Sequence, residues 1–284
     1  MKPAPFAYHR PGSTAEAVSL LAADPEAKVL AGGQSLVPLL SMRLAAPSAL
    51  VDLGGIPDLD SIRVDAAGVT IGALARHAAV LASDEAAARQ PLLRLALQHV
   101  AHPTIRNRGT TVGSIVHADP AAEMPVVLRL LGGSVAVEGP TGRRTVEAAD
   151  LFVGPLETSL GHDEVATSAF FPALPAGGGV AFEEIARRHG DYAMAGVAVV
   201  VRREGEQVVD VRAGFVSVSD TPVVVDLTDV VTGGGDPGEA ALASLEPAAD
   251  IHATADYRAH LVRVLTRRVV AAAIADASSR SLVR

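Results

Sequence analysis

The chain has 284 residues, of which 49% are hydrophobic, and this is enough to build a buried core spread over two or three subdomains. Its formal net charge of −8 argues against a nucleic-acid partner, because a phosphate backbone is bound by concentrated positive charge. The sequence contains no cysteine, so any cysteine-ligated iron–sulfur cluster that works with this chain must lie on another polypeptide.

The N-terminal segment MKPAPFAYHRPG has no apolar core of signal-peptide length. No later segment reaches the roughly 18 uninterrupted apolar residues that a membrane span needs. Because it also lacks cysteine for disulfides, the chain suits a reducing compartment. We therefore expect a cytoplasmic protein without a membrane span.

Residues 1–55 are expected to form a small α/β unit, because helix-like and strand-like segments alternate along them. A helix is expected to begin at Ser13 or Thr14 and to run through Ala23. The elements expected after it are a strand at Lys28 to Ala31, a Gly32-Gly33 turn, an apolar helix at Leu36 to Leu44 and a strand at Ala49 to Leu53. Strands separated by helices favour parallel pairing.

The turn sequence AGGQSL, from Ala31 to Leu36, connects the strand to the start of the helix. Such a turn directs backbone N–H groups and the positive end of a helix dipole at one point, which suits an anion. In an α/β unit it also lies at the carboxyl end of a strand, where such sheets bind ligands. The turn matches neither the G-x-G-x-x-G pattern nor the P-loop, and an ordinary tight turn is the alternative interpretation.

Residues 56–174 are expected to form a second unit. Its expected elements are a strand at Val69 to Ala73, helices at Pro91 to His102 and Glu123 to Leu131, a strand at Ser134 to Glu138 and a strand at Val165 to Phe171. His99 and His102 fall three residues apart on the first of these helices, a spacing that could bind a metal. Because no third ligand lies nearby in the sequence, we interpret them as an exposed or capping pair.

A run of small residues from Gly109 to Ser114, within PTIRNRGTTVGSIVHADPAAE, would let another molecule approach the backbone closely. Exposed N–H groups in such a run can form a concave anion site. Two loops of this kind in one chain suggest the two phosphates of a dinucleotide held from opposite sides.

Asp119-Pro120 follows this run and predicts the start of a helix, with an N-cap acceptor before a proline at the first helical position. Glu123 would then lie about one turn into the helix. The carboxylates therefore come at a helix N-terminus, next to the second loop.

Residues 175–284 are expected to form a third unit after a flexible linker at 175–179. Its expected elements are strands at Val197 to Arg202, Val208 to Val218 and Val223 to Leu227, and a helix at about Thr254 to Ala277. The glycine-rich segment from Gly233 to Gly238 has no lysine and no strand–helix frame, so we do not interpret it as a nucleotide site.

The segments AGGQSLVPLLSMRLA and TIRNRGTTVGSIVHADPAAEMP resemble the two flavin motifs of the FAD-binding medium subunits of the molybdenum hydroxylases. Within that family the similarity is greatest to the medium subunits of aerobic carbon monoxide dehydrogenase and its relatives. PAPFAYHRP and GDYAMAGVAVVV are also similar, so the resemblance covers nearly the whole chain. It implies an α+β fold of the PCMH type, in which two α/β subdomains hold FAD and a C-terminal domain of antiparallel sheet and helices follows.

The resemblance also implies which residues contact FAD. Those assigned to the two loops, chiefly around the pyrophosphate, are Ala31, Gly32, Gly33, Gln34, Ser35, Leu36, Thr110, Gly113 and Ser114. Glu123 matches an acidic residue that accepts hydrogen bonds from the ribityl hydroxyls, and His117 matches a second cofactor contact. Leu160 matches a leucine that packs on the flavin, and Tyr192 an aromatic position near the isoalloxazine ring.

Each assignment has a structural alternative. Glu123 could compensate a helix dipole at the surface, His117 could be structural and Leu160 could be a core residue. Arg106, Asn107 and Arg108 could face the flavin loop or a neighbouring subunit, or could be solvated.

The second motif departs from the family pattern at Val112, where the family usually has a glycine. Valine is rarely tolerated at positive φ. We expect Val112 to have an extended backbone and to turn its side chain into the subdomain core.

No Ser/His/Asp set, metal-ligand cluster or general-base pair stands out in the sequence. The resemblance implies an electron-transfer subunit that passes electrons from [2Fe–2S] clusters on a small subunit, through FAD, to an acceptor. A large subunit with the molybdenum cofactor would complete the complex, as a dimer of heterotrimers. The alternatives are a free-standing flavin oxidoreductase and a cofactor-free assembly or binding protein of the same fold.

Overall fold

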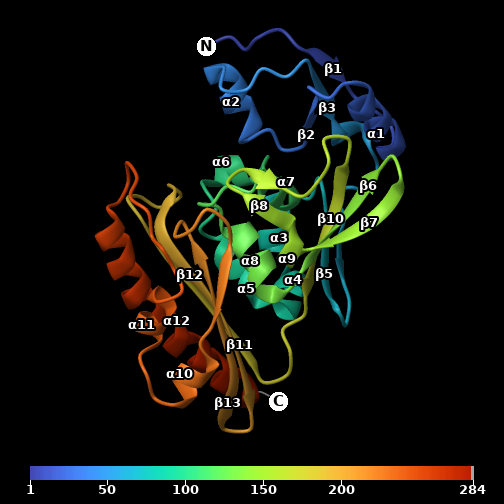
Figure 1. Ribbon diagram of the computed structural model, residues 1–284. Coiled ribbons are helices and arrows are strands. Elements are labelled where there is room, and N and C mark those ends of the chain that lie inside the picture. The colour runs from blue at the N-terminus through green and yellow to red at the C-terminus, as the bar shows by residue number, and fades with distance from the viewer. Residues whose placement is uncertain (283–284) are drawn as a thin grey trace.

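The computed structural model describes residues 1–282, and Figure 1 shows their arrangement from the N-terminal unit at one end to the C-terminal helix at the other. The described strands form a three-stranded, a five-stranded and a four-stranded sheet, together with a two-stranded hairpin. No helix among residues 1–282 is both long and apolar enough to cross a membrane.

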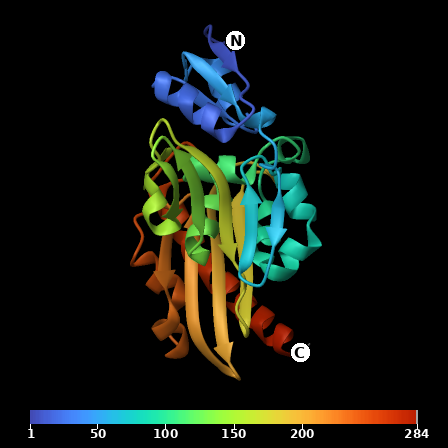
Figure 2. The same ribbon diagram turned by 90° about the vertical axis from the view of Figure 1, so that its right-hand side faces the viewer.

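The N-terminal unit is a parallel sheet, as expected, with strand order β1-β3-β2. Its elements are β1 (Ala7–His9), α1 (Thr14–Ala23), β2 (Lys28–Leu30), α2 (Leu36–Met42), β3 (Ala49–Asp52) and the 3₁₀ turn η1 (Leu53–Gly55). The Ser13 hydroxyl accepts a hydrogen bond from the Glu16 N–H, so Ser13 is the N-cap of α1. Figure 2 shows this unit lying on the end of the larger body.

The middle of the chain contributes the five-stranded antiparallel sheet, in the order β4-β5-β10-β6-β7, and most of the short helices. The strands of this sheet are β4 (Ile62–Val64), β5 (Gly68–Gly72), β6 (Ser134–Gly139), β7 (Gly142–Glu147) and β10 (Val165–Pro172). The separate two-stranded hairpin consists of β8 (Phe152–Gly154) and β9 (Glu157–Thr158). The helices in the middle of the chain are α3 (His77–Ala82), α4 (Asp84–Arg89), α5 (Pro91–Leu97), α6 (Pro103–Arg106), α7 (Thr111–His117), α8 (Glu123–Leu131) and α9 (Ala148–Leu151).

Two expectations for this region are wrong. The helix that begins at Pro91 ends at Leu97, because Ala101 takes a left-handed conformation with φ of 44° and α6 starts after it. His99 therefore lies in a turn and His102 is the N-cap of α6, so they do not share a helix. Among residues 1–282 there is no group of three or more His, Cys, Asp or Glu residues that could hold a metal ion.

Asp119-Pro120 does not start a helix either. Asp119 Oδ1 accepts a hydrogen bond from the Ala121 N–H at 2.9 Å, and the Asp119 carbonyl accepts from the Ala122 N–H at 3.0 Å. These bonds close a turn, and α8 begins only at Glu123. An Asx-type turn uses the same aspartate side chain as a helix cap, which is why the sequence pattern did not separate them.

The C-terminal part is an antiparallel sheet, in the order β11-β12-β13-β14, with helices beside it. Its elements are β11 (Gly178–Ala186), β12 (Ala193–Glu204), β13 (Gln207–Val216), β14 (Val223–Asp226), α10 (Thr228–Thr232), α11 (Pro237–Leu242) and α12 (Ala255–Leu282). The final helix is thus longer than predicted. The expected linker is also shorter, since Gly178 and Gly179 are the first residues of β11.

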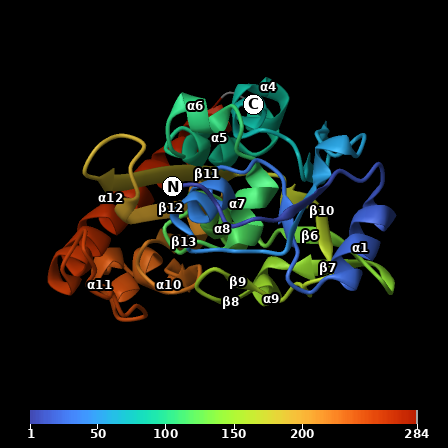
Figure 3. The same cartoon turned by 90° about the horizontal axis from the view of Figure 1, so that it is seen from above.

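Helices lie on both sides of this sheet (Figure 1, Figure 3). The buried side chains of its strands alternate between two cores. On one face, Val180, Ala198 and Val216 join the main core with α5 and α8. On the other face, residues such as Val199 and Phe215 pack in a second core with α12. The alternation is that of a sheet covered on both sides.

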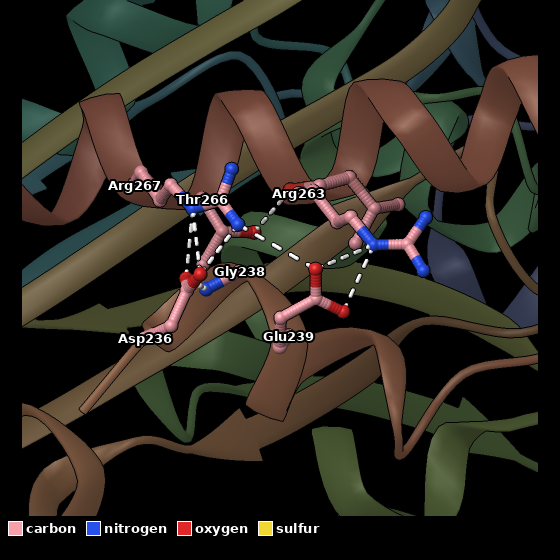
Figure 4. Close-up of polar contacts among 7 residues, drawn as sticks. Asp236, Gly238, Glu239, Arg263, Thr266 and Arg267 are labelled. Carbon is pink, nitrogen blue, oxygen red and sulfur yellow. Dashed lines mark hydrogen bonds and ion pairs between the residues drawn. The ribbon is translucent and has the colours of Figure 1, made fainter.

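Helix α11 is joined to α12 by charged contacts, shown in Figure 4. Asp236 caps α11 by accepting from the Gly238 N–H at 2.9 Å, and it also pairs with Arg267 of α12. Glu239 accepts from Arg263 Nε at 2.9 Å with each of its carboxylate oxygens. Hydrogen bonding from Arg267 is the main cause that lowers the pKa of Asp236 to about 2. The glycine-rich segment before α11 therefore leads into a capped, ion-paired helix.

We predict that Gly179→Val destabilises the protein, because a Cβ at this position would overlap the Ala273 carbonyl and the backbone of Ala277 in α12. Over-packing of this kind costs about 1–3 kcal/mol or more, and the melting temperature should fall by several degrees. Gly12→Val is the control, since the nearest atom to a Cβ there is 3.9 Å away. Equal melting temperatures for the two variants would contradict the tight α12–β11 contact.

Candidate functional site

The first loop runs from Ala31 to Ser35, between the end of β2 and the start of α2. Gly33 has φ of 71°, a conformation that favours glycine, and its carbonyl accepts the Val37 N–H at 3.0 Å. The Gln34 side chain donates to the Gly32 carbonyl at 3.2 Å. Ser35 is exposed and makes no capping hydrogen bond with its side chain. The loop is thus closed by its own backbone while its tip faces outward.

The two predicted loops touch each other directly. A Cβ at Gly32 would lie 2.6 Å from the Arg108 carbonyl oxygen, 2.8 Å from the Gly109 Cα and 3.0 Å from the Thr110 nitrogen. Residues about 75 positions apart in the sequence are therefore in backbone contact, as a two-loop site requires. The space beside Gly32 is filled by protein backbone, so this glycine is needed for the contact between the loops.

The second loop is the N-terminus of helix α7. The Thr110 hydroxyl accepts from the Gly113 N–H at 3.1 Å, and the Thr110 carbonyl accepts from the Ser114 N–H at 3.0 Å. A Cβ at Gly113 would lie only 2.5 Å from Thr110 Oγ1. Gly113 therefore makes room for the capping hydroxyl, and the run of small residues is helical from Thr111 onward, where the sequence suggested an open loop.

Val112 lies in this helix, so its backbone is helical and the expectation of an extended backbone is wrong. Its φ is not positive, and its side chain is buried in the main core. The expectation that the Val112 side chain turns into the core is thus confirmed. A helix start places the side chain of Val112 inward while the neighbouring Thr110 and Gly113 form the cap.

His77, which we did not predict, supports the second loop from behind. The backbone N–H of His77 donates to the Gly109 carbonyl at 3.0 Å, and its ring Nδ1 lies 3.2 Å from Thr111 Oγ1. Burial, and then the positive charge of Arg106, lower the pKa of His77 to about 4. A neutral, buried imidazole therefore holds the start of α7 at neutral pH. No spacing in the sequence indicated that His77 lies beside the start of α7.

The turn between α7 and α8 contains one non-glycine residue with positive φ and is hydrogen-bonded to two others. Ala118, Leu156 and Ser217 all have positive φ, at 53°, 60° and 60°. The Leu156 N–H donates to the Ala118 carbonyl and the Ser217 N–H donates to the Pro120 carbonyl, each at 2.9 Å. Non-glycine residues in this conformation cost free energy and gather at functional sites. Here three of them surround a single turn.

Glu123, at the start of α8, is 8% exposed. Burial is the main cause that raises its pKa to about 8, and the nearby charges of Glu184 and Asp119 raise it further. The Glu123 carboxyl is therefore not the solvated, dipole-compensating residue of the alternative interpretation. It lies inside the protein, close to two other acidic groups.

Ser217, whose backbone lies against this turn, has a buried Oγ without a hydrogen-bond partner, and the same holds for Glu184 Oε2 on β11 and Asp191 Oδ2 in the β11–β12 connection. Arg187 approaches Asp191 Oδ2 at 3.7 Å, which is an ion pair but too long for a hydrogen bond. Buried polar atoms are almost always paired in folded proteins. Buried oxygens without hydrogen-bond donors fit a ligand that supplies hydroxyl and N–H donors, as the ribityl chain and ring of a flavin do.

The remaining predicted residues differ in their exposure and in the elements that carry them. Tyr192 is 60% exposed, and its partial burial and the carboxylates Asp119, Glu123 and Asp191 raise its pKa. His117 is the last residue of α7, and Leu160 is half-buried against the main core. Arg106 donates to the Val100 and Ala101 carbonyls at 2.8 Å, so it holds the turn before α6.

The polar residues of this region that the sequence did not single out come mainly from the C-terminal sheet and the connections beside it. Glu184 and Ser217 lie on or beside strands whose alternation does not show which side chain faces the site. Asp191 precedes the predicted Tyr192 in the β11–β12 connection.

Comparison with known proteins matches the whole length of this architecture. Residues 4–174 match the FAD binding domain in molybdopterin dehydrogenase, and residues 180–273 match the CO dehydrogenase flavoprotein C-terminal domain. The nicotine 6-hydroxylase medium subunit of Paenarthrobacter nicotinovorans is 42% identical over 278 residues, covering 95% of this chain and 98% of that protein.

The carbon monoxide dehydrogenase medium chain of Afipia carboxidovorans is 38% identical over 288 residues, covering 98% of this chain and 100% of that one. A solved structure of carbon monoxide dehydrogenase from Hydrogenophaga pseudoflava matches with a TM-score of 0.91 at 37% identity, over 97% of this chain and 99% of that chain. The predicted α+β fold, with an FAD-binding part and a C-terminal antiparallel sheet, is confirmed.

We predict that Val112→Gly destabilises the protein by about 2–4 kcal/mol, because it removes a buried side chain from a helix and adds the backbone entropy of glycine. Flavin affinity should not increase, since the Val112 side chain points into the core. Thermal unfolding and a flavin titration of the two proteins measure both effects. A large gain in flavin affinity would show that the valine obstructs the site.

Proposed function

The chain belongs to the FAD-binding medium subunits of the molybdenum hydroxylases, and we propose that it is the electron-transfer subunit of a multi-subunit oxidoreductase. When bound, FAD would supply the redox step between [2Fe–2S] clusters of a partner subunit and a final acceptor. The observation that carries this proposal is the direct backbone contact between the two motif loops.

The residues of this chain bind and orient the cofactor in this proposal. The loops that start α2 and α7 would hold the pyrophosphate, with Ser35 and Ser114 as hydroxyl donors. Glu123 would accept from the ribityl hydroxyls, and the exposed ring of Tyr192 would lie near the isoalloxazine. We propose the corresponding domains as 1–55 and 56–174 for the cofactor and 175–284 for the covering domain.

The proposed partners are a small subunit with two [2Fe–2S] clusters and a large subunit with the molybdenum cofactor. The absence of cysteine from the chain supports this division, because thiolate-ligated clusters need another polypeptide. Relatives named for nicotine and for carbon monoxide are similarly close, at 42% and 38% identity. That pattern supports placing substrate selection on a different subunit.

We predict that the protein, isolated with its complex, is yellow and holds FAD noncovalently, since the chain has no cysteine for a thioether link. Acid precipitation should release the flavin into the supernatant, where its absorbance spectrum identifies it. Flavin that stays in the pellet would contradict noncovalent binding. A colourless protein would favour the cofactor-free alternative, and flavin without co-purifying subunits would favour a free-standing oxidoreductase.

We predict that Glu123→Ala weakens FAD binding by about 1–3 kcal/mol, because charge-assisted hydrogen bonds of a buried carboxylate carry this magnitude. The dissociation constant is measured by the quenching of flavin fluorescence. Glu85→Ala is the matched control, because Glu85 also lies in the first turn of a helix but is exposed. Equal dissociation constants for both variants would remove Glu123 from the site.

A further inference from the structure

The connection between β11 and β12 packs against the turn between α5 and α6. Gly190 in this connection has φ of 80°, and a Cβ on it would lie 2.7 Å from His102 Nδ1 and 2.8 Å from the Ala101 carbonyl oxygen. Ala101 itself has φ of 44°, so two residues in left-handed conformations meet at this contact. Because an added Cβ would collide with a backbone carbonyl and a ring, the contact needs glycine at this position.

Two further contacts join β11 and the connection to the same turn, through His99. On β11, Glu184 Oε1 lies 3.5 Å from His99 Nδ1, and the Glu184 side chain is 4% exposed. The His99 ring centroid lies 5.1 Å from that of Phe182 on β11 and 6.4 Å from that of His189 in the connection. Rings at these separations are in packing range. The turn before α6 therefore supports both the end of β11 and the connection that follows it.

The connection itself is held together between Gly190 and Tyr192. The Asp191 N–H donates to the Arg188 carbonyl at 3.0 Å, and Asp191 Oδ1 accepts from the Tyr192 N–H at 3.1 Å. Arg187 and Arg188 also approach Asp191 Oδ2, at 3.7 and 3.9 Å. The Tyr192 side chain is 60% exposed, so burial of its ring does little to fix its position. A displacement of Gly190 would therefore move Tyr192.

Helix α6 joins the same turn to the two motif loops. His102 is the N-cap of this four-residue helix, and at its other end the Ile105 carbonyl accepts from the Gly109 N–H at 2.7 Å. Gly109 in turn borders Gly32 of the first loop. Figure 1 shows α6 on the side of the middle part that faces the N-terminal unit. Because four helical residues rise only about 6 Å, α6 is a short, regular link between the loops and the connection that carries Tyr192.

We propose that Gly190 and His102 are positioning residues of the FAD site, which place the Tyr192 ring relative to the two loops. The inference rests on the proposed function, in which the loops hold the pyrophosphate and Tyr192 lies near the isoalloxazine. A cofactor held at two points binds best when its protein contacts already have the required separation, since ordering them on binding costs affinity. The contact between Gly190 and His102 sets this separation through α6.

The test uses ¹⁹F NMR of the full-length, flavin-free chain labelled with fluorotyrosine, because the chain has only three tyrosines. Tyr192→Phe identifies the Tyr192 signal. Gly190→Ala should shift that signal and leave those of Tyr8 and Tyr257 in place, because the added Cβ pushes the connection off the turn. Gly234→Ala is the matched control, since Gly234 has φ of 75° but no atom within 4 Å of a Cβ, and it should leave all three signals in place.

A double-variant comparison separates this contact from general strain at a positive φ. The His102 side chain makes no capping hydrogen bond, so α6 should keep its start in His102→Ala. Loss of the ring removes one of the two groups that a Cβ at Gly190 would meet. Gly190→Ala should therefore shift the Tyr192 signal less in the His102→Ala background than in the native one, because contacting residues are coupled. Equal shifts in both backgrounds would overturn the inference.

A second measurement uses the fluorescence of bound FAD in the purified complex. A tyrosine ring beside a flavin quenches its fluorescence by passing an electron to the excited ring, so Tyr192→Leu should raise the fluorescence. Gly190→Ala should raise it too, whereas Gly234→Ala should not. A native protein without FAD would overturn the proposed function, and the inference with it. Fluorescence that rises in Tyr192→Leu but not in Gly190→Ala would overturn the inference and leave the proposed function standing.

Discussion

The burial of both faces of the C-terminal sheet is the constraint on which the rest of the molecule depends. One face packs on α12, and the other covers α5 and α8 of the preceding part of the chain. This covering brings Ser217 to the turn between α7 and α8, where its N–H donates to the Pro120 carbonyl, although the two residues lie far apart in the sequence. The site is therefore assembled by packing between sheet and helices, and it lies where three segments of the chain meet.

The buried Glu123 carboxyl and the positive φ angles near it lower the stability of the folded protein. The pKa of Glu123 is raised from 4.5 to about 8, so its ionisation opposes folding increasingly as the pH rises from about 4.5 to 8. At the upper end the penalty is on the order of 5 kcal/mol. Strained φ angles at Ala118, Leu156 and Ser217 add roughly 1–3 kcal/mol each. A chain selected for stability alone would replace these residues, whereas a chain that binds a polar cofactor has a use for them.

The sequence predicted local features well where a single physical signal was sufficient. Ser13 before an apolar helix, and valine-rich alternation along β12 and β13, led to correct elements. The errors arose where two structures use the same residue, as at Asp119, whose side chain serves a turn and not a helix cap. Glu184 could not be found, because the choice between Glu183 and Glu184 for the inner face depends on which face of β11 meets α5. That register is set by contacts distant in sequence.

The glycines of the two motifs show how a pattern shared within a family can be separated into physical requirements. Gly113 must lack a side chain, because a Cβ would collide with the Thr110 hydroxyl that caps α7. Gly32 must lack one because the backbone of the second loop fills its Cβ position. Val112 is under neither requirement, since its backbone is helical and its side chain enters the core. The valine therefore departs from the motif at a position where the fold has room for its side chain, and the contact between the loops is preserved.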